Sequence, residues 1–234
     1  MIIAQIATIP ERACILKRVL RSLVRQVDEI RLAVAVDLID DDKAFAADAG
    51  FLKHPKIKVT YHDNSLQDGA KFINAPLEKG HHVLVCDDDI EYPANFAESM
   101  VKICKEPFKD HAILTVMGKN LAPRPVPNYF KSEIQCFKTF EKVKEFAQVE
   151  IPGTCGMVYC TDNVVISVKD MLSPNSDLCV GAWAHRHGVR CYVIPHGEGW
   201  LRDLTPDLPA GSPNMFDRYK DNDSQLTEFI NKNL

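Results

Sequence analysis

The chain has 234 residues, a formal net charge of -4 at pH 7 and a pI near 6.1. Hydrophobic residues make up 46% and charged residues 26% of it, which is enough apolar material for a sizeable core. This charge balance gives no overall basic field for nucleic acid, although a local basic patch stays open. Because no apolar stretch reaches the length of a membrane span and the start lacks a basic leader, we expect a cytoplasmic protein.

Eight cysteines are scattered along the chain without CxxC spacing or an accompanying histidine pair. Most of them are expected to be reduced small hydrophobes. Cys86, Cys179 and Cys191 lie in apolar segments, where a buried free thiol is commoner than a metal ligand or a nucleophile.

The first half alternates between short apolar runs and segments of helical periodicity. Apolar residues from Leu16 to Val24 recur at helical spacing, with basic residues on the opposite face. Such alternation predicts an α/β fold, with a Rossmann-like, mostly parallel sheet flanked by helices. The predicted strands are Ile2 to Thr8, Ile30 to Val36, Ile57 to Tyr61 and Val83 to Cys86; the predicted helices begin near Pro10, span Ala70 to Lys79, and run from Pro93 to about Lys105.

The strand that ends at Cys86 leads directly into Asp87, Asp88 and Asp89. Adjacent carboxylates repel one another, so a hard divalent cation with oxygen ligands is a natural neighbour. In an extended segment Asp87 and Asp89 point the same way and can share one ion. Open α/β sheets bind ligands at the carboxyl ends of their strands, which favours a site over a simple acidic loop. The run from Asp40 to Asp42 has no strand leading into it and is expected to be a solvated loop.

From residue 118 the chain changes character. Prolines at 123, 125 and 127 predict a long loop from Gly118 to Lys131 that covers one face as an acceptor-side flap. The stretch from Ile134 to Glu150 fits either a strand pair or a short helix, and both stay open. Further elements are expected as strands at Ala112 to Met117, Met157 to Cys160 and Val189 to Ile194, a helix from Asp177 to His187 capped by Gly188, and a flexible segment from Leu208 to Asp217 before a short final helix.

Several motifs occur together in one order: a first strand ending in Thr8-Ile9-Pro10-Glu11-Arg12, a helix with Arg21-Ser22-Leu23 and Gln26, the loop Asp68-Gly69-Ala70-Lys71, and the strand into Asp87-Asp88-Asp89. In this order they resemble the GT-A type nucleotide-sugar glycosyltransferases, family 2-like, including small phage and bacterial relatives. A lone DxD is a weak signal, so the series over the first ninety or so residues carries the resemblance. The second half matches more loosely, through Ser176-Asp177-Leu178 and His196.

The resemblance implies a single GT-A domain over residues 1–234, with a nucleotide-sugar-binding half (1–117), an acceptor half (118–205) and a tail (206–234). It implies Mn²⁺ or Mg²⁺ held by Asp87, Asp89 and His196, and Asp177 as the general base. An exposed turn for His196 and a helix-capping role for Asp177 stay open as alternatives. Donor contacts are expected from Thr8, Glu11, Arg12, Asp37, Asp68, Lys71, Asp87 and Asp88.

The function expected from this resemblance is metal-dependent transfer of a sugar from a nucleotide sugar, a UDP-sugar being favoured, to a hydroxyl acceptor. The acceptor is a saccharide or a hydroxylated base in DNA. One alternative is a sugar-1-phosphate nucleotidyltransferase, which needs a glycine-rich phosphate loop that Thr8 to Arg12 lacks. The other is a non-catalytic nucleotide-sugar-binding protein, although Asp87, Asp89 and Asp177 are all retained.

Overall fold

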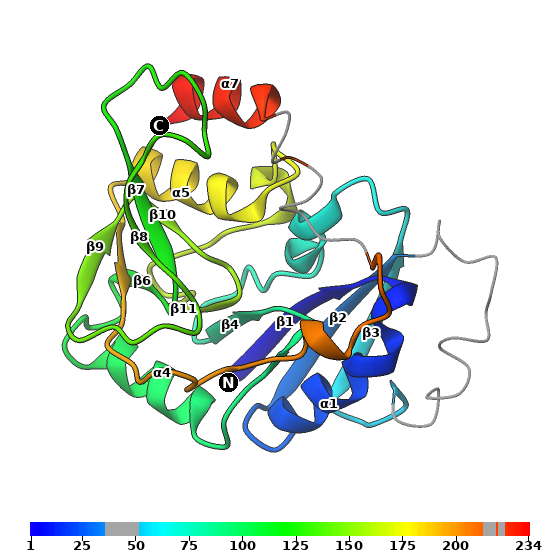
Figure 1. Ribbon diagram of the computed structural model, residues 1–234. Coiled ribbons are helices and arrows are strands. Elements are labelled where there is room, and N and C mark those ends of the chain that lie inside the picture. Colours follow the sequence, from blue (N-terminus) through cyan, green and yellow to red (C-terminus); the bar gives the residue numbers. More distant parts are fainter. Residues whose placement is uncertain (36–51, 213–218, 220–222) are drawn as a thin grey trace.

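A mixed sheet runs through the centre of the computed structural model, which describes residues 1–35, 52–212, 219 and 223–234 (Figure 1). Over these residues the sheet has eight strands in the order β3-β2-β1-β4-β11-β6-β12-β9. Neighbours are parallel from β3 to β4 and between β6 and β12, whereas β11 and β9 run antiparallel to their neighbours. The strands are β1 (Ile2–Thr8), β2 (Glu29–Ala35), β3 (Ile57–His62), β4 (His82–Cys86), β6 (Ala112–Thr115), β9 (Ala147–Val149), β11 (Gly156–Cys160) and β12 (Arg190–Val193).

Helices cover both faces of this sheet (Figure 1). On one face, α1 (Ala13–Leu23) and α4 (Phe96–Lys105) pack their apolar stripes against the strands. On the other face, α5 (Ser176–His187) buries Cys179, Val180 and Trp183 against the sheet. The last helix, α7 (Ser224–Asn233), lies outside α5 and shares a third apolar cluster with it. The sheet is therefore buried on both faces, as the predicted α/β fold requires.

Short elements complete the fold around the sheet. A three-stranded sheet has the order β10-β7-β8, and β13 pairs with β5. Their bounds are β10 (Ile151–Pro152), β7 (Gly118–Leu121), β8 (Glu133–Phe137), β13 (Arg202–Asp203) and β5 (Ile90–Glu91), and the 3-10 helices are η1 (Pro10–Arg12), η2 (Gln67–Phe72), η3 (Val168–Asp170) and η4 (Thr205–Asp207).

Most predicted elements are confirmed with boundary shifts of a few residues, but two differ. No α-helix spans Ala70 to Lys79: this described segment holds the end of η2 followed by turns, since Pro76 and Gly80 interrupt it. The predicted loop from Gly118 begins instead as the strand β7, and the chain becomes irregular only from Ala122, where the three prolines follow. The open stretch from Ile134 to Glu150 contains the strand β9 and most of β8. Asp40 to Asp42 lie outside the described residues.

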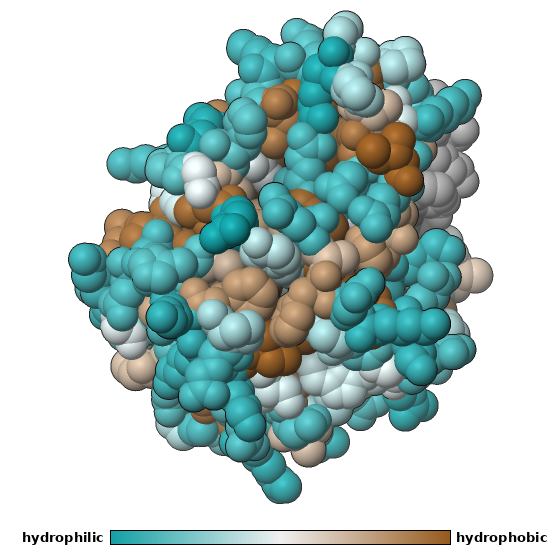
Figure 2. Space-filling model, turned by 90° about the vertical axis from the view of Figure 1, so that its left-hand side faces the viewer, coloured by the Kyte–Doolittle hydropathy of each residue, from teal (hydrophilic) through white to brown (hydrophobic). Residues whose placement is uncertain are grey.

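The face that carries β8 and β9 is mainly hydrophilic, and its apolar surface is scattered rather than gathered in one area (Figure 2). Ile134 on β8 and Phe146 before β9 are among the exposed apolar side chains. Across the described part of the chain, no helix has both the length and the apolar character needed to cross a membrane.

The C-terminal helix α7 fixes the proline-rich loop that follows β7. The carboxylate of Asp223, just before α7, accepts hydrogen bonds from Asn128 Nδ2 at 2.8 Å and from the Phe130 backbone N–H at 3.1 Å. Thr227 Oγ1 accepts from the Tyr129 N–H at 2.9 Å. Tyr129 is consequently buried, at 2% exposure, under α7. The loop is therefore held by side chains from a segment about a hundred residues later.

Asp223→Ala should destabilise the protein by about 1–3 kcal/mol, because it leaves two half-buried donors of the loop without their acceptor. The free energy of unfolding from urea denaturation measures this. Glu228→Ala, on the exposed side of the same helix, is the matched control and should change stability by less than about 0.5 kcal/mol. Equal effects of the two substitutions would show that Asp223 does not hold the loop.

Candidate active site

Three carboxylates follow β4 at the carboxyl end of the sheet. The antiparallel register places Gly156, the first residue of β11, beside Cys86, the last residue of β4, so Thr154 and Cys155 arrive at the same edge. Tyr92 links the segment after β4 to the segment before β11, because its hydroxyl donates to the Cys155 carbonyl and accepts from the Asp87 N–H. The strand order therefore brings residues about seventy positions apart in the sequence to one edge.

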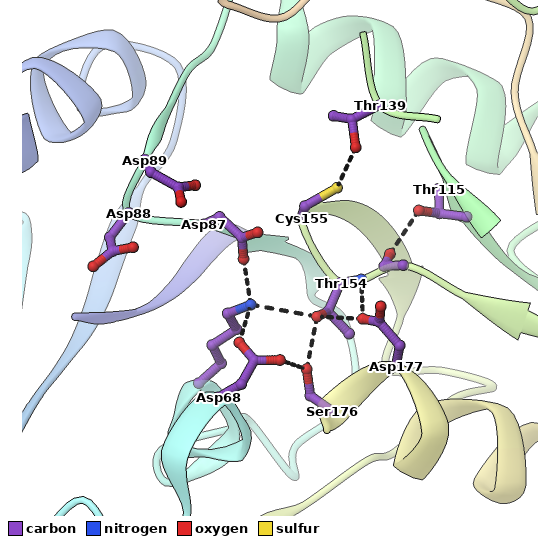
Figure 3. Close-up of polar contacts among 12 residues, drawn as sticks. Asp68, Asp87, Asp88, Asp89, Thr115, Thr139, Thr154, Cys155, Ser176 and Asp177 are labelled. Atoms are coloured by element: carbon purple, nitrogen blue, oxygen red, sulfur yellow. Dashed lines mark hydrogen bonds and ion pairs between the residues drawn. The ribbon is translucent and has the colours of Figure 1, made fainter. Parts of the chain in front are cut away.

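Lys71 is the centre of this cluster. Its ammonium group is buried and forms ion pairs with Asp87 and, at 2.6 Å, with Asp68. It also donates to Thr154 Oγ1 at 3.3 Å (Figure 3). Asp68 and Lys71 both come from η2, whose single turn points both side chains toward the end of β4. One buried cation thus links η2, β4 and the segment before β11.

A second group of hydrogen bonds extends from Lys71 to the start of α5. Thr154 Oγ1 lies 2.7 Å from Ser176 Oγ and donates to Asp177 Oδ1 at 2.8 Å. The Thr154 N–H donates to the same Asp177 oxygen at 2.8 Å, and Ser176 Oγ donates to Asp68 (Figure 3). Asp177 is therefore held through one of its carboxylate oxygens.

Asp177 does not cap α5. The N-cap is Asn175, whose side-chain oxygen accepts from the Leu178 N–H at 3.0 Å. The capping interpretation of Asp177 is therefore wrong, and its carboxylate is directed to Thr154 instead.

Arg12 balances the other two carboxylates. Its Nη1 lies 2.5 Å from Asp88 Oδ1 and 2.9 Å from Asp89 Oδ2. The guanidinium comes from η1, which follows β1, the strand beside β4. Burial would lower the pKa of Arg12, but Asp88 and Asp89 outweigh it and raise the pKa, so this side chain stays charged.

Negative charge is in excess at this site. Burial raises the pKa of Asp89 to about 7, with added repulsion from Asp87 and Asp88. Burial, together with repulsion from Asp68, raises the pKa of Asp177 to about 6. Burial also raises the pKa of Asp87 despite its contact with Lys71. For Asp68, by contrast, Lys71 outweighs burial and holds the pKa below its usual value. Two cations do not neutralise these carboxylates, so the site favours a further positive charge.

Comparison with known proteins gives a likeness at the level of structure. No family model matches the sequence, and neither does any curated protein. Similar solved structures include S. aureus TarS 1-349, a GT-A-type glycosyltransferase, with a TM-score of 0.51 and 14% identity over 88% of this chain. A crystal structure of GalNAc-T7 with UDP, GalNAc and Mn²⁺ has a TM-score of 0.59 and 11% identity over 92% of this chain. The chain spans 61% and 45% of the lengths of these two structures.

The chain has a GT-A glycosyltransferase fold. The fold class predicted from the sequence is thereby confirmed. In this GT-A fold the acidic cluster occupies the carboxyl end of β4, near the middle of the sheet.

His196 has the environment of a metal ligand. The side chain is 8% exposed, so it is not the exposed turn that the sequence left open. Its Nδ1 lies 2.9 Å from the Ile194 carbonyl, which leaves Nε2 as the acceptor of the neutral ring, and this buried Nε2 has no hydrogen-bond partner. The chain after His196 returns to the acids, because β13 pairs with β5 and the Leu204 N–H donates to the Asp89 carbonyl.

These residues fit a divalent cation by donor type and charge. Asp87 and Asp89 offer hard oxygen ligands, and the orphaned Nε2 of His196 offers a nitrogen. The three groups do not form a closed trio here: among the described residues, only His82, Cys104 and Asp110 place ligand atoms within 4.8 Å of one another. Lys71 and Arg12 hold Asp87 and Asp89 instead.

The remaining predicted donor contacts differ in position. Thr8 is buried at the end of β1, and Glu11 is exposed on η1 one residue before Arg12. Asp37 lies outside the described residues. Sequence reasoning missed Thr154 and Tyr92, which link the acids to β11 and to Asp177. No spacing rule in the sequence pointed to these two side chains.

The raised pKa of Asp177 predicts how Asp177→Asn changes stability with pH. Between about pH 4 and pH 6 the folded chain takes up a proton that an unfolded Asp releases, so wild-type stability falls as the pH rises through this range. Asn keeps an oxygen for Thr154 and does not titrate. The unfolding free energy of the variant minus that of the wild type should therefore be larger at pH 8 than at pH 4, by on the order of 1–2 kcal/mol. Urea denaturation at both pH values measures it, and a constant difference would refute the pKa shift.

Proposed function

We propose that this chain is a metal-dependent glycosyltransferase that moves a sugar from a nucleotide sugar, a UDP-sugar, to a hydroxyl acceptor. The observation that carries the proposal is the arrangement at the end of β4 in a GT-A fold. There the acids Asp87, Asp88 and Asp89 are joined by the Lys71 and Thr154 contacts to a second, separate carboxylate, Asp177. One group of acids suits a metal and a diphosphate, and the other suits an acceptor hydroxyl.

The donor diphosphate would lie at the acid cluster. When bound, Mn²⁺ or Mg²⁺ would neutralise the charge that develops on the diphosphate as the sugar–phosphate bond breaks. Asp87, Asp89 and His196 are the proposed ligands, and an imidazole among them favours Mn²⁺. Arg12 and Lys71 keep their positive charge, since their acidic partners raise both pKa values despite burial. They border the acids on two sides and would hold the diphosphate by charge-assisted hydrogen bonds.

Asp177 would act on the acceptor. Its Oδ1 accepts two hydrogen bonds from Thr154, which fixes the carboxylate and leaves Oδ2 for the proton of an acceptor hydroxyl. The acceptor oxygen then attacks the anomeric carbon, and the nucleoside diphosphate leaves. A pKa of about 6 makes Asp177 ionised at neutral pH and more basic than an ordinary aspartate.

A saccharide-type hydroxyl is the proposed acceptor. The segment from Gly118 to Lys131 carries basic and aromatic side chains of the kind that a modified DNA base would need, but Lys119, Arg124 and Tyr129 serve internal contacts. Lys119 pairs with Glu133 and lies 4.6 Å from the centre of the Tyr129 ring, and Arg124 Nη2 lies 2.5 Å from Glu150. These contacts do not support nucleic-acid binding through this loop.

Melting temperatures with a panel of nucleotide sugars, with Mn²⁺ and with EDTA, test the proposal. A metal-dependent rise with a UDP-sugar, followed by slow hydrolysis and by transfer to an oligosaccharide mixture, is expected. Binding without turnover would identify a non-catalytic binding protein. Release of pyrophosphate from UTP and a sugar 1-phosphate would identify a nucleotidyltransferase instead.

Asp89→Asn should abolish Mn²⁺-dependent binding of UDP, because it removes a charged metal ligand. It should also raise the activation free energy of sugar transfer by several kcal/mol. Calorimetric titration with UDP in Mn²⁺ measures the binding. Asp207→Asn is the control, since the Asp207 side chain is 51% exposed and forms an ion pair with Arg18 away from the acid cluster. Near-normal UDP affinity in Asp89→Asn would remove Asp89 from the metal site.

Asp177→Asn should leave UDP affinity nearly unchanged and lower kcat by roughly a hundredfold or more, the range for losing a positioned general base. Asn preserves the acceptor for Thr154, so a fall in kcat reports the lost base rather than lost packing. Steady-state kinetics measures kcat and the KM for the nucleotide sugar separately. A change in that KM alone, or no change in either constant, would leave Asp177 with a purely structural role.

A further inference from the structure

A second cluster of metal-ligating side chains lies at the opposite end of β4 from the acids. His82 begins β4, Cys104 lies in the last turn of α4, and Asp110 follows that helix. One ligand atom from each lies within 4.8 Å of the others, and His82 Nε2 is 2.9 Å from Asp110 Oδ1. Within the described chain, no other trio of such groups is this close.

The surrounding backbone holds the three residues in place. The Asp110 N–H donates to the Cys104 carbonyl at 2.9 Å, and Asn163 Nδ2 donates to the Asp110 carbonyl at 3.0 Å. Asp110 has a φ of 62°, a left-handed conformation that only Asn, Asp and Gly adopt readily. The cluster therefore stands on β4, α4 and the segment after β11.

A further cysteine lies on the strand beside β4. Cys160 on β11 is directly opposite His82 in the antiparallel register, so the two side chains project from the same face of the sheet. Cys160 is 1% exposed, so it adds a buried sulfur on the His82 side of the sheet.

We propose that His82, Cys104 and Asp110 form a second metal site, specific for a borderline cation such as Zn²⁺. Sulfur, nitrogen and oxygen donors together suit Zn²⁺ rather than Mg²⁺ or Ca²⁺. Ligand atoms in a tetrahedral zinc site are roughly 3.3–3.8 Å apart, so the His82 and Asp110 atoms need only separate slightly from their direct hydrogen bond. Binding transfers the Cys104 thiol proton to solvent as the metal–sulfur bond forms.

The site would act on stability rather than on catalysis. It joins the start of β4 to the end of α4, on the edge of the sheet away from Asp87, and Cys104 is fully buried. A metal that binds the folded chain and not the unfolded one raises the melting temperature, and the stabilisation grows with the logarithm of the metal concentration relative to its Kd.

Titration of the EDTA-treated full chain with Co²⁺ under reducing conditions tests the proposal. We expect a near-ultraviolet thiolate-to-cobalt band that Zn²⁺ displaces, together with a Zn²⁺-dependent rise in melting temperature. None of the ligands proposed for the acidic site, Asp87, Asp89 and His196, is a cysteine, so Asp89→Asn should keep the band. Cys136→Ser, which changes an exposed cysteine, should keep it too.

Cys104→Ser should abolish the cobalt band. Because Cys104 is in the core, Asp110→Asn provides the second test: Asn tolerates the left-handed backbone, so the variant should fold and bind Co²⁺ at least tenfold more weakly. Circular dichroism confirms folding in each case. Absence of the band in the wild type, or a band that survives both substitutions, would overturn the proposal.

Discussion

The buried ammonium group of Lys71 is the contact on which the candidate active site depends. A charge taken out of water needs partners within hydrogen-bonding distance, and Lys71 finds them in Asp68, Asp87 and Thr154. These partners come from η2, the end of β4 and the segment before β11, so one cation fixes three chain segments relative to one another. Removing one partner from such a pair typically costs about 3–5 kcal/mol, which makes the arrangement specific.

The acid cluster and its contact with Arg12 were largely predictable from the sequence, because parallel strands end at a common edge. A strand running into Asp87, Asp88 and Asp89 and a first strand leading to Arg12 had to meet there if β1 and β4 were neighbours, and they are. Periodicity and strand order carry this information locally. The error over Ala70 to Lys79 arose because the apolar residues of this segment were assigned to one helix although Pro76 lies within it, and only the short η2 forms at its start.

The contacts around Thr154 and Asp177 were less predictable, because they join residues distant in sequence. The antiparallel insertion of β11 between β4 and β6 brings Thr154 to Lys71, and no local pattern specifies that pairing. Likewise, Ser176 and Asp177 both looked like caps of α5, whereas Asn175 has that role. The preceding asparagine satisfies the first turn of the helix and so frees Asp177 for Thr154.

The two ends of β4 illustrate how one strand supports two different chemistries. At its carboxyl end, neighbouring carboxylates outnumber Arg12 and Lys71, the basic residues that pair with them, and such oxygen ligands would suit a hard cation. At its amino end, His82 meets the thiol of Cys104 and one carboxylate, a softer and less charged donor set. Since a strand of five residues separates them, a metal at one end would not share ligands with the other. The softness of the ligand atoms would therefore decide which cation each end of the strand binds.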